Sequence, residues 1–230
     1  MLTLDKVLYR QGEFSLSADF SVAPGARVAI LGPSGAGKST LLDLIAGFVV
    51  PDQGRILWQG DDLTRVAPGD RPLSLLFQDN NLFPHLTVAR NVGLGLRPDL
   101  RLSADQKQAV QAALARVGLS GMGNRKPSAL SGGQRSRVAL ARVLLRARPL
   151  MLLDEPFAAL GPALKAEMLA LVRELADETG ASVLMVSHDP ADARALAGDT
   201  ILVANGVASP PRETGALFAD PPAALRSYLG

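Results

Sequence analysis

The sequence contains no cysteine, which excludes a disulfide framework and thiol chemistry. It also lacks long apolar runs. No stretch approaches the roughly 18 apolar residues that a membrane-spanning helix needs, and the N-terminal segment MLTLDKVLYR has no apolar core typical of a signal peptide. We therefore expect neither a signal peptide nor a membrane span, so any membrane role would come through a partner.

Net charge and aromatic content are also low: the formal charge is +2, and aromatic side chains make up 4% of the 230 residues. The bases are unevenly spread, with nine Lys or Arg and no acid between Gln106 and Leu153, and eleven acids against five bases from Asp154 onward. The basic stretch indicates either nucleic-acid binding or solvated helix faces near a bound polyphosphate. Because no aromatic residue alternates with these bases, we favour the second interpretation and expect no nucleic-acid partner.

The most informative stretch that is present is GPSGAGKST, which starts at Gly32 and fits the phosphate-loop pattern G-x-x-x-x-G-K-[ST]. An apolar run at 27–31 precedes it and another at 41–46 follows, which is the strand and helix context that the motif requires. A flexible glycine-rich turn is the less favoured alternative. Consecutive backbone amides at a helix N-terminus form an anion site, Lys38 brings a positive charge to the β- and γ-phosphates, and Ser39 offers a hydroxyl to Mg²⁺.

Polar side chains follow three further apolar strands that we expect at 73–77, 150–153 and 183–187. The residues at these strand ends are Gln78, the pair Asp154 and Glu155, and His188. In a phosphate-loop protein the first carboxylate supports Mg²⁺, and the second orients or deprotonates an attacking water. Taken alone, Gln78 and His188 also fit ordinary polar strand ends. Their position at the carboxyl edge of a parallel sheet favours a nucleotide site.

A second glycine-rich segment, LSGGQ at 130–134, comes before another apolar periodic stretch. Ser131 is a good N-cap, and two glycines at a helix N-terminus make a further anion site. From the residues alone, this function and an ordinary capped helix are equally favoured.

The strands alternate with helices, which predicts an α/β fold around a mostly parallel sheet. Alternating apolar residues in 1–22 predict an antiparallel N-terminal β lobe, and Asn205-Gly206 predicts a hairpin turn. Helices are expected at 103–117, with a Ser103/Gln106 capping box, and at 162–179. No strand is expected from about 82 to 148, which we interpret as an inserted helical subdomain.

The order of GPSGAGKST, Gln78, LSGGQ, Asp154-Glu155 and His188 resembles the ATPase subunit of an ABC transporter over essentially the whole chain. The segment 71–96 is similar to bacterial importers, most of all to the ATPase subunits of thiamine importers. Ferric-iron, sulfate and polyamine importers share a looser version of it. An LSGGQ-containing ATPase that acts on DNA is a more distant alternative, which needs a long coiled-coil insertion that this chain lacks. The resemblance implies a P-loop NTPase (RecA-like) core in one domain, 1–230, without the C-terminal regulatory domain of larger importers.

The resemblance also implies roles for individual residues. Asp154, Ser39 and Gln78 are expected at Mg²⁺, and Glu155, His188 and Gln78 at the attacking water. Tyr9 is expected to stack on adenine. The remaining residues expected to bind ATP are Gly32, Pro33, Ser34, Gly35, Ala36, Gly37, Lys38, Ser39 and Thr40. Those expected to bind the ATP of a second copy are Ser131, Gly132, Gly133 and Gln134.

The expected partners are therefore ATP, Mg²⁺, a second copy of the chain in a head-to-tail dimer, and transmembrane permease subunits that dock near residues 80–92. A periplasmic substrate-binding protein is an indirect partner, and the expected location is the cytoplasmic face of the bacterial inner membrane. One departure from the family pattern stands out. Gly161 occupies the position where Ser-Ala-Leu-Asp usually places an aspartate that helps communication across the dimer.

Overall fold

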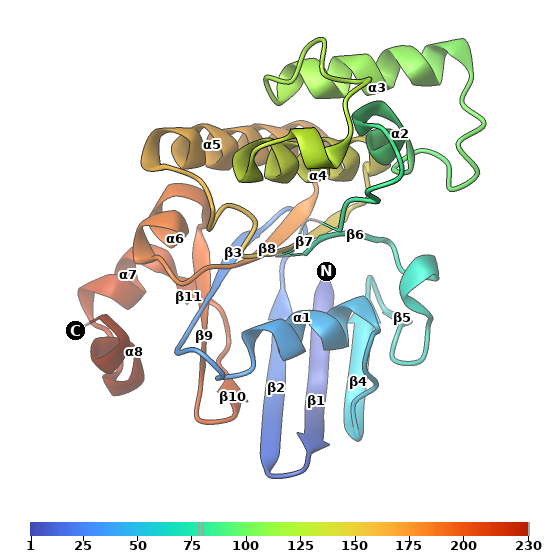
Figure 1. Cartoon of the computed structure of the whole chain (residues 1–230). Helices are drawn as coiled ribbons and strands as arrows, with labels where there is room; N and C mark the ends of the chain where they lie inside the picture. Colours follow the sequence, from blue (N-terminus) through green and yellow to red (C-terminus); the bar gives the residue numbers. More distant parts are fainter. Residues whose placement is uncertain (78, 80, 230) are drawn as a thin grey trace.

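The computed structural model describes residues 1–77, 79 and 81–229, and its described strands form one continuous sheet of eleven strands (Figure 1). The spatial order is β5-β4-β1-β2-β10-β9-β3-β8-β7-β6, and β11 pairs with β9. The strands are β1 (Leu2–Gln11), β2 (Phe14–Val22), β3 (Arg27–Leu31), β4 (Gln53–Trp58), β5 (Asp61–Asp62), β6 (Leu73–Leu76), β7 (Leu150–Asp154), β8 (Ser182–Val186), β9 (Asp199–Ala204), β10 (Val207–Ala208) and β11 (Arg212–Glu213).

The parallel half of the sheet consists of β9, β3, β8, β7 and β6, which pair in that order. The four strands expected in this half are confirmed to within one residue at each end. Because parallel strands end at the same edge, β3, β7 and β8 deliver the phosphate loop, the Asp154–Glu155 pair and His188 to one side of the molecule.

The antiparallel half consists of β1, β2, β4 and β5. The sequence indicates these strands as a lobe but gives no sign of how they join the core. The junction is β10, which runs antiparallel to β9 and parallel to β2, so the two halves share one sheet. The turn between β9 and β10 is the expected Asn205-Gly206 turn, with φ of 49° and 73° at the two residues, as a type I′ turn requires.

Two helical layers cover opposite faces of the parallel strands (Figure 1). Helix α1 (Lys38–Ala46) packs on one face, between the parallel and antiparallel halves, in a core that includes Leu150 and Leu152. The other face takes Met151 and Leu153 and packs against α2–α5. This alternation along β7 is the two-residue period of a strand buried on both faces.

The helical layer is formed by α2 (Val88–Gly93), α3 (Ala104–Arg116), α4 (Gly132–Arg146) and α5 (Pro162–Thr179), and the described residues between 82 and 148 contain no strand. The Ser103 hydroxyl accepts from the Gln106 amide at 3.2 Å, and the Gln106 side chain accepts from the Ser103 amide at 3.0 Å, so the expected capping box is present. Pro162 occupies the first turn of α5, as expected.

The chain closes with α6 (Pro190–Leu196), α7 (Thr214–Ala219) and α8 (Ala223–Leu229), which lie together beside β9 (Figure 1). Leu225 of α8 is fully buried in a small cluster with Leu202 and Leu217. Within the described part of the chain, no helix is long and apolar enough to cross a membrane.

Candidate nucleotide site

The expected phosphate loop is the turn between β3 and α1. Gly32–Gly37 form the turn, and Lys38, Ser39 and Thr40 begin α1. Pro33, Ser34 and Gly35 are exposed, while Ala36 is half-buried. Two positions exclude any side chain, because they combine positive φ with close neighbours. A Cβ at residue 32 would lie 2.0 Å from the carbonyl oxygen of Val203, and one at residue 37 would lie 2.8 Å from the ring of Phe14. The loop backbone is therefore open to a ligand on its solvent side and closed on the side that packs against Val203 and Phe14.

Lys38 is 8% exposed, and its ammonium folds over the loop to donate to the carbonyl oxygens of Gly32 at 2.7 Å and Pro33 at 2.8 Å. Burial lowers the pKa of Lys38, and the nearby carboxylates of Glu155 and Asp154 partly offset this effect. A partly desolvated ammonium interacts strongly with an anion at close range, so a phosphate group beside Lys38 would be stabilised. The loop thus holds a cation placed to bind phosphate oxygens.

Asp154, at the end of β7, lies near the hydroxyl of Ser39 on α1. Burial is the main cause that raises the pKa of the Asp154 carboxyl, the nearby Ser39 hydroxyl lowers it, the charge of Glu155 raises it and that of Lys38 lowers it. The carboxylate of Asp43, one helical turn after Ser39, also lies within electrostatic range of Asp154. A hydroxyl and a carboxylate are the kind of oxygen donors that Mg²⁺ prefers, and a cation would relieve the partly buried negative charge. Ser39 and Asp154 therefore fit the metal; Gln78, the third expected ligand, lies outside the described residues.

Glu155 directly follows β7 with a φ of 43°, a left-handed backbone that non-glycine residues rarely adopt. Its amide donates to the Val186 carbonyl of β8 at 3.2 Å, which ties this turn to the neighbouring strand. The Oε2 atom of Glu155 lies 3.3 Å from Nδ1 of His188. Backbone strain at a polar strand end is common at functional sites, and here it aims the carboxylate at the histidine that follows β8.

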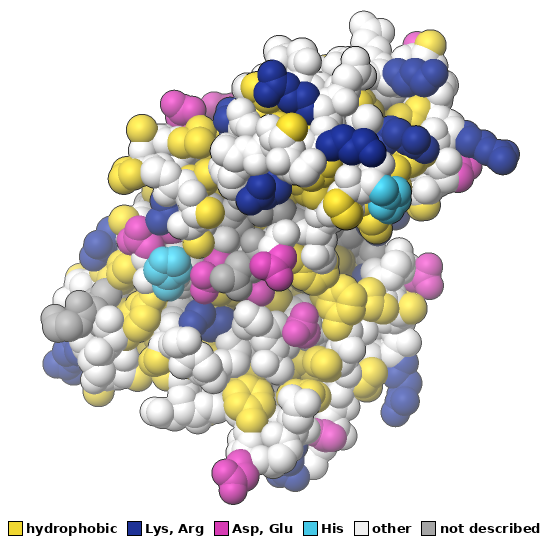
Figure 2. Space-filling view, viewed as in Figure 1, with side chains coloured by type: hydrophobic (Ala, Val, Ile, Leu, Met, Phe, Trp, Pro, Cys, Tyr) yellow, Lys and Arg dark blue, Asp and Glu magenta, His cyan; other side chains and the backbone are white. Residues whose placement is uncertain are grey.

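Lys38 at the start of α1 is therefore brought together with the strand-end groups Asp154, Glu155 and His188, as the sequence indicates. Figure 2 shows acidic side chains gathered midway on this face, below a helical layer rich in Lys and Arg. The glycines of the loop expose backbone amides, the lysine supplies a positive charge, and the carboxylates and the histidine supply acid–base groups. Such a constellation can bind a polyphosphate and activate a water.

The LSGGQ segment lies elsewhere. Ser131 caps α4, its hydroxyl accepting from the Gln134 amide at 3.2 Å, and the Gln134 side chain accepts from the Ser131 amide at 3.0 Å. Gly133 packs closely, since a Cβ there would lie 2.8 Å from the side chain of Leu160, which would have to shift to admit it. Ser131 is exposed, and Gly132, Gly133 and Gln134 are half-buried. Because α4 and α1 pack on opposite faces of the sheet, the structure does not join this segment to the phosphate loop of its own chain.

Tyr9 of β1 pairs with Leu16 of β2, so both side chains point to the same face of the sheet. Leu16 and Phe14 are the side chains nearest to Gly37, which places this aromatic face beside the phosphate loop. Phe14 is a residue of the site that the sequence analysis missed. Its alternation with Leu16 is the signal of a core strand, and only the pairing of β2 against the loop reveals its position.

Gly161 caps α5 with a φ of −67°, which any residue can adopt. A Cβ at this position would meet no atom within 4 Å. The fold therefore does not require glycine here, and an aspartate fits the same backbone.

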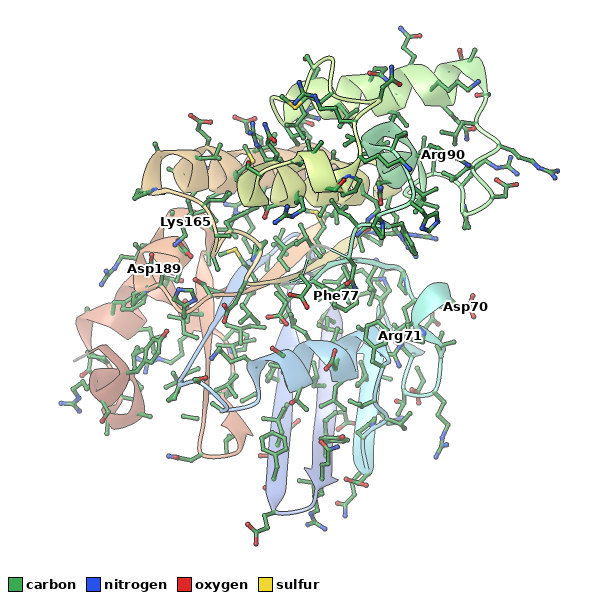
Figure 3. The ribbon with its side chains drawn as sticks, viewed as in Figure 1. Asp70, Arg71, Phe77, Arg90, Lys165 and Asp189 are labelled. Carbon is green, nitrogen blue, oxygen red and sulfur yellow. The ribbon has the colours of Figure 1, made fainter. Side chains whose placement is uncertain are left out.

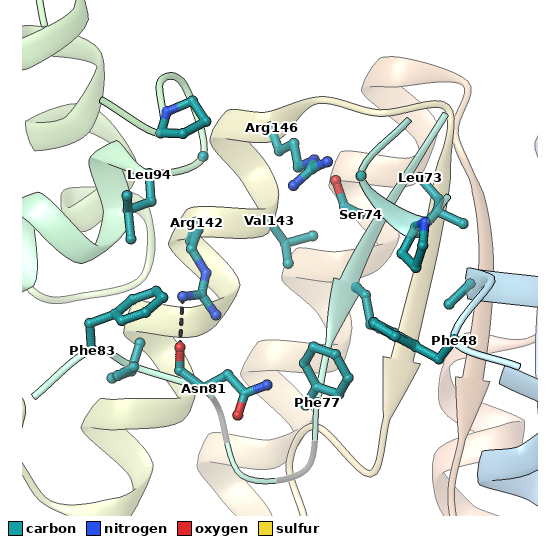
Figure 4. A pocket seen from close by; sticks show the side chains of 17 residues that line it. Phe48, Leu73, Ser74, Phe77, Asn81, Phe83, Leu94, Arg142, Val143 and Arg146 are labelled. Carbon is teal, nitrogen blue, oxygen red and sulfur yellow. Dashed lines mark hydrogen bonds between the residues drawn. The ribbon is translucent and has the colours of Figure 1, made fainter. Parts of the chain in front are cut away.

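A separate groove of about 660 Å³ opens between the helical layer and the sheet (Figure 4). Phe48, Phe77 and Phe83 line it together with Arg142 and Arg146 of α4. Arg142 donates to the carbonyl oxygen of Asn81 at 2.9 Å. One wall belongs to the segment 80–92 expected to contact a membrane subunit; within that segment, Asn80 lies outside the described residues.

Known proteins resemble this chain in both sequence and structure. The family model described as ABC transporter matches residues 16–158. The chain is 65% identical over 230 residues to the thiamine import ATP-binding protein ThiQ of Cereibacter sphaeroides, with both chains fully covered. It is 50% identical to the protein of that name from Yersinia pseudotuberculosis, covering 100% of this chain and 97% of the relative.

Two solved structures of the ATP-binding cassette MJ0796 superpose on this fold. One is described as a dimeric bacterial ABC transporter cassette, with a TM-score of 0.83, 30% identity, and coverage of 93% of this chain and 99% of that one. The other is a dimeric post-hydrolysis state bound to ADP and Pi, with a TM-score of 0.82 and the same identity and coverage.

Proposed function

Because this chain belongs to the ABC transporter family, we propose that it is the ATP-hydrolysing subunit of a thiamine importer. The observation that carries the ATPase is the convergence of the phosphate loop, Asp154, Glu155 and His188 at one sheet edge. The cargo is supported by relatives named for thiamine import at 50–65% identity, most of them similar over the full length.

In this proposal the loop amides and Lys38 bind the β- and γ-phosphates of ATP, and Phe14 and Tyr9 provide an aromatic face for the base. Ser39 and Asp154 hold Mg²⁺, which when bound supplies charge neutralisation for the phosphates. Glu155 orients the attacking water and accepts its proton. With Nδ1 of His188 directed at Glu155, Nε2 is left to contact the γ-phosphate.

A second copy of the chain completes the site. The LSGGQ segment is a capped helix start with an exposed serine, and it lies on the opposite side of the sheet from its own phosphate loop. Head-to-tail pairing brings Ser131, Gly132, Gly133 and Gln134 of one copy to the ATP of the other. ATP then favours the closed pair and ADP the open one, and this difference in affinity is the energy source for transport.

The groove of about 660 Å³ suits a helix from a permease subunit. Three phenylalanines offer apolar contact, and Arg142 and Arg146 offer positive charge. Asn91, fully buried in α2, holds the adjoining loop: its side chain bonds the amide of Phe83 at 2.8 Å and the carbonyls of Phe83 and Thr87 at 3.1 and 3.0 Å. Docking there places the chain at the cytoplasmic face of the inner membrane, where a periplasmic substrate-binding protein delivers cargo to the permease from the other side.

The test is uptake of labelled thiamine by cells that carry either the intact gene or Glu155→Gln at matched expression. We expect uptake with the intact gene and none with the variant. Normal uptake by the variant would contradict the assignment. If uptake is lost only for ferric iron, sulfate or a polyamine, the transporter stands and the cargo is wrong.

A further inference from the structure

His188 is exposed although its neighbours in the turn are buried or half-buried, and the site needs its ring to be fixed. The His188 side chain is 58% exposed and its contact with Glu155 is 3.3 Å long. Packing around the ring therefore contributes little to its position. The ring is directed chiefly by the backbone of the turn between β8 and α6.

Both flanks of this turn are anchored within the core domain. On one side, the Ser187 amide donates to the Ile30 carbonyl of β3 at 3.2 Å. On the other, the ammonium of Lys165 lies 2.8 Å from a carboxylate oxygen of Asp189 and 2.7 Å from one of Asp192 (Figure 3). The hydrogen bond from Lys165 is the main cause of the lowered pKa of Asp189. The turn is thus attached to β3 through Ser187 and to α5 through Asp189. His188 lies between these two anchored residues.

A third anchor reaches His188 itself, from the end of the chain. The hydroxyl of Tyr228 on α8 donates a hydrogen bond to the backbone carbonyl of His188. The pKa of Tyr228 is raised by burial and by the carboxylates of Glu155 and Asp189, so the hydroxyl keeps its proton at neutral pH. Those two carboxylates belong to the site and to the turn, so the Tyr228 hydroxyl lies within electrostatic range of both.

Helix α8 can hold this hydroxyl in place because it is itself anchored. Leu225 is fully buried against Leu202 and Leu217, and the Tyr228 ring packs on the same cluster. Arg194 of α6 stacks over Phe218 of α7 at 4.2 Å, which joins the helix after His188 to the helix before α8. The C-terminal helices therefore form a support for the histidine turn.

We propose that Tyr228 is a positioning residue for ATP hydrolysis, which fixes the backbone of His188 so that its ring faces Glu155 and the γ-phosphate. This inference rests on the proposed function, since it needs His188 in the site. It assigns a role in hydrolysis to the C-terminal helix, which contains none of the family motifs.

The direct test is Tyr228→Phe, which keeps the ring and its packing and removes only the donor. We expect kcat for ATP hydrolysis to fall about threefold to tenfold, because the variant loses one neutral hydrogen bond that holds the turn. KM for ATP should stay within about twofold, because Lys38 and the loop amides are untouched. The matched control is Ser227→Ala, which removes an exposed hydroxyl that donates to the Ala223 carbonyl within the same helix and should leave kcat unchanged.

A second measurement separates positioning from general loosening. The chain has two histidines, His85 and His188, so their ring protons give two resolvable NMR signals. In Tyr228→Phe the His188 signal should shift while that of His85 stays in place, and the melting temperature should change by no more than about 3 °C.

Unchanged kcat in Tyr228→Phe would overturn the inference, and so would a lower kcat with both histidine signals unmoved. A wild-type protein without Mg²⁺-dependent ATPase activity would instead contradict the proposed function. The two failures are therefore distinguishable.

Discussion

Arg71 lies against the C-terminus of α1, the helix whose N-terminus carries the phosphate-binding residues. Its replacement should destabilise the whole nucleotide site. Arg71 is 1% exposed, and Figure 3 labels its side chain. Its guanidinium donates to the carbonyls of Leu44 at 2.9 Å and Ile45 at 2.7 Å, at the C-terminus of α1, and to those of Val66 at 2.9 Å and Thr64 at 3.3 Å. Positive charge at a helix C-terminus also stabilises the helix dipole. Arg71 thus links α1 to the strand β6.

The change Arg71→Met keeps an apolar stem and removes every donor. The Leu44 carbonyl retains the Gly47 amide at 3.2 Å, but the oxygens of Ile45, Val66 and Thr64 lose the donor that the guanidinium provides. An unsatisfied buried carbonyl costs about 1–3 kcal/mol, and the carbonyls of Val66 and Thr64 are only partly buried, so the variant should lose about 3 kcal/mol of unfolding free energy. At about 2–4 °C per kcal/mol for a chain of this size, the melting temperature should fall by about 10 °C.

Thermal unfolding followed by circular dichroism measures this directly. The matched control is Arg55→Met, whose guanidinium lies 2.7 Å from Asp5 at the surface with 59% of the side chain exposed. Solvent screens an exposed ion pair and leaves it little effect on stability, so the control should melt within about 3 °C of the wild type. If Arg71→Met melts no lower than this control, the reasoning about the buried cap is refuted.

Three further predictions concern the site. Lys38→Ala should abolish tight ATP binding by calorimetry, and unchanged affinity would remove the lysine from its assigned role. The raised pKa of Asp154 means that ionising this carboxyl costs more free energy in the folded than in the unfolded state, so Asp154→Asn should melt at a higher temperature than the wild type at pH 7.5 in EDTA. The difference in melting temperature should shrink as the pH falls through the carboxyl pKa, and Mg²⁺-dependent hydrolysis should be lost. A difference that does not change with pH would contradict this. Because Glu155 has a φ of 43°, Glu155→Gly should be about 1 kcal/mol more stable than Glu155→Ala, with both inactive; equal melting temperatures would exclude backbone strain at this position.

The parts of the fold that the sequence predicts share a simple origin. Apolar runs with a fixed period become strands buried on both faces, and the topology of parallel strands brings their polar ends together. This is why Asp154, Glu155 and His188 meet Lys38 in the structure. Capping boxes and the Asn205-Gly206 turn are likewise local, because they depend on residues within a few positions of each other.

The features that the sequence does not predict depend on packing between distant segments. Tyr228 reaches a carbonyl 40 positions earlier in the chain, and Arg71 caps a helix that ends 25 positions before it. Phe14 looks like an ordinary core residue until β2 is placed beside the phosphate loop. The left-handed backbone of Glu155 carries no signal in its residue type. The roles assigned to individual side chains toward ATP, Mg²⁺ and a second copy stay predictions.

The measurement that tests the central claim most directly is the mass of Glu155→Gln by light scattering, with Mg²⁺ and either ATP or ADP. The variant keeps the phosphate loop and the LSGGQ segment but lacks the carboxylate that activates water. We predict a species of twice the 24.1 kDa of one chain in ATP and a single chain in ADP. A variant that binds ATP and yet stays at the mass of one chain, at concentrations well above its nucleotide affinity, would contradict the shared two-copy site.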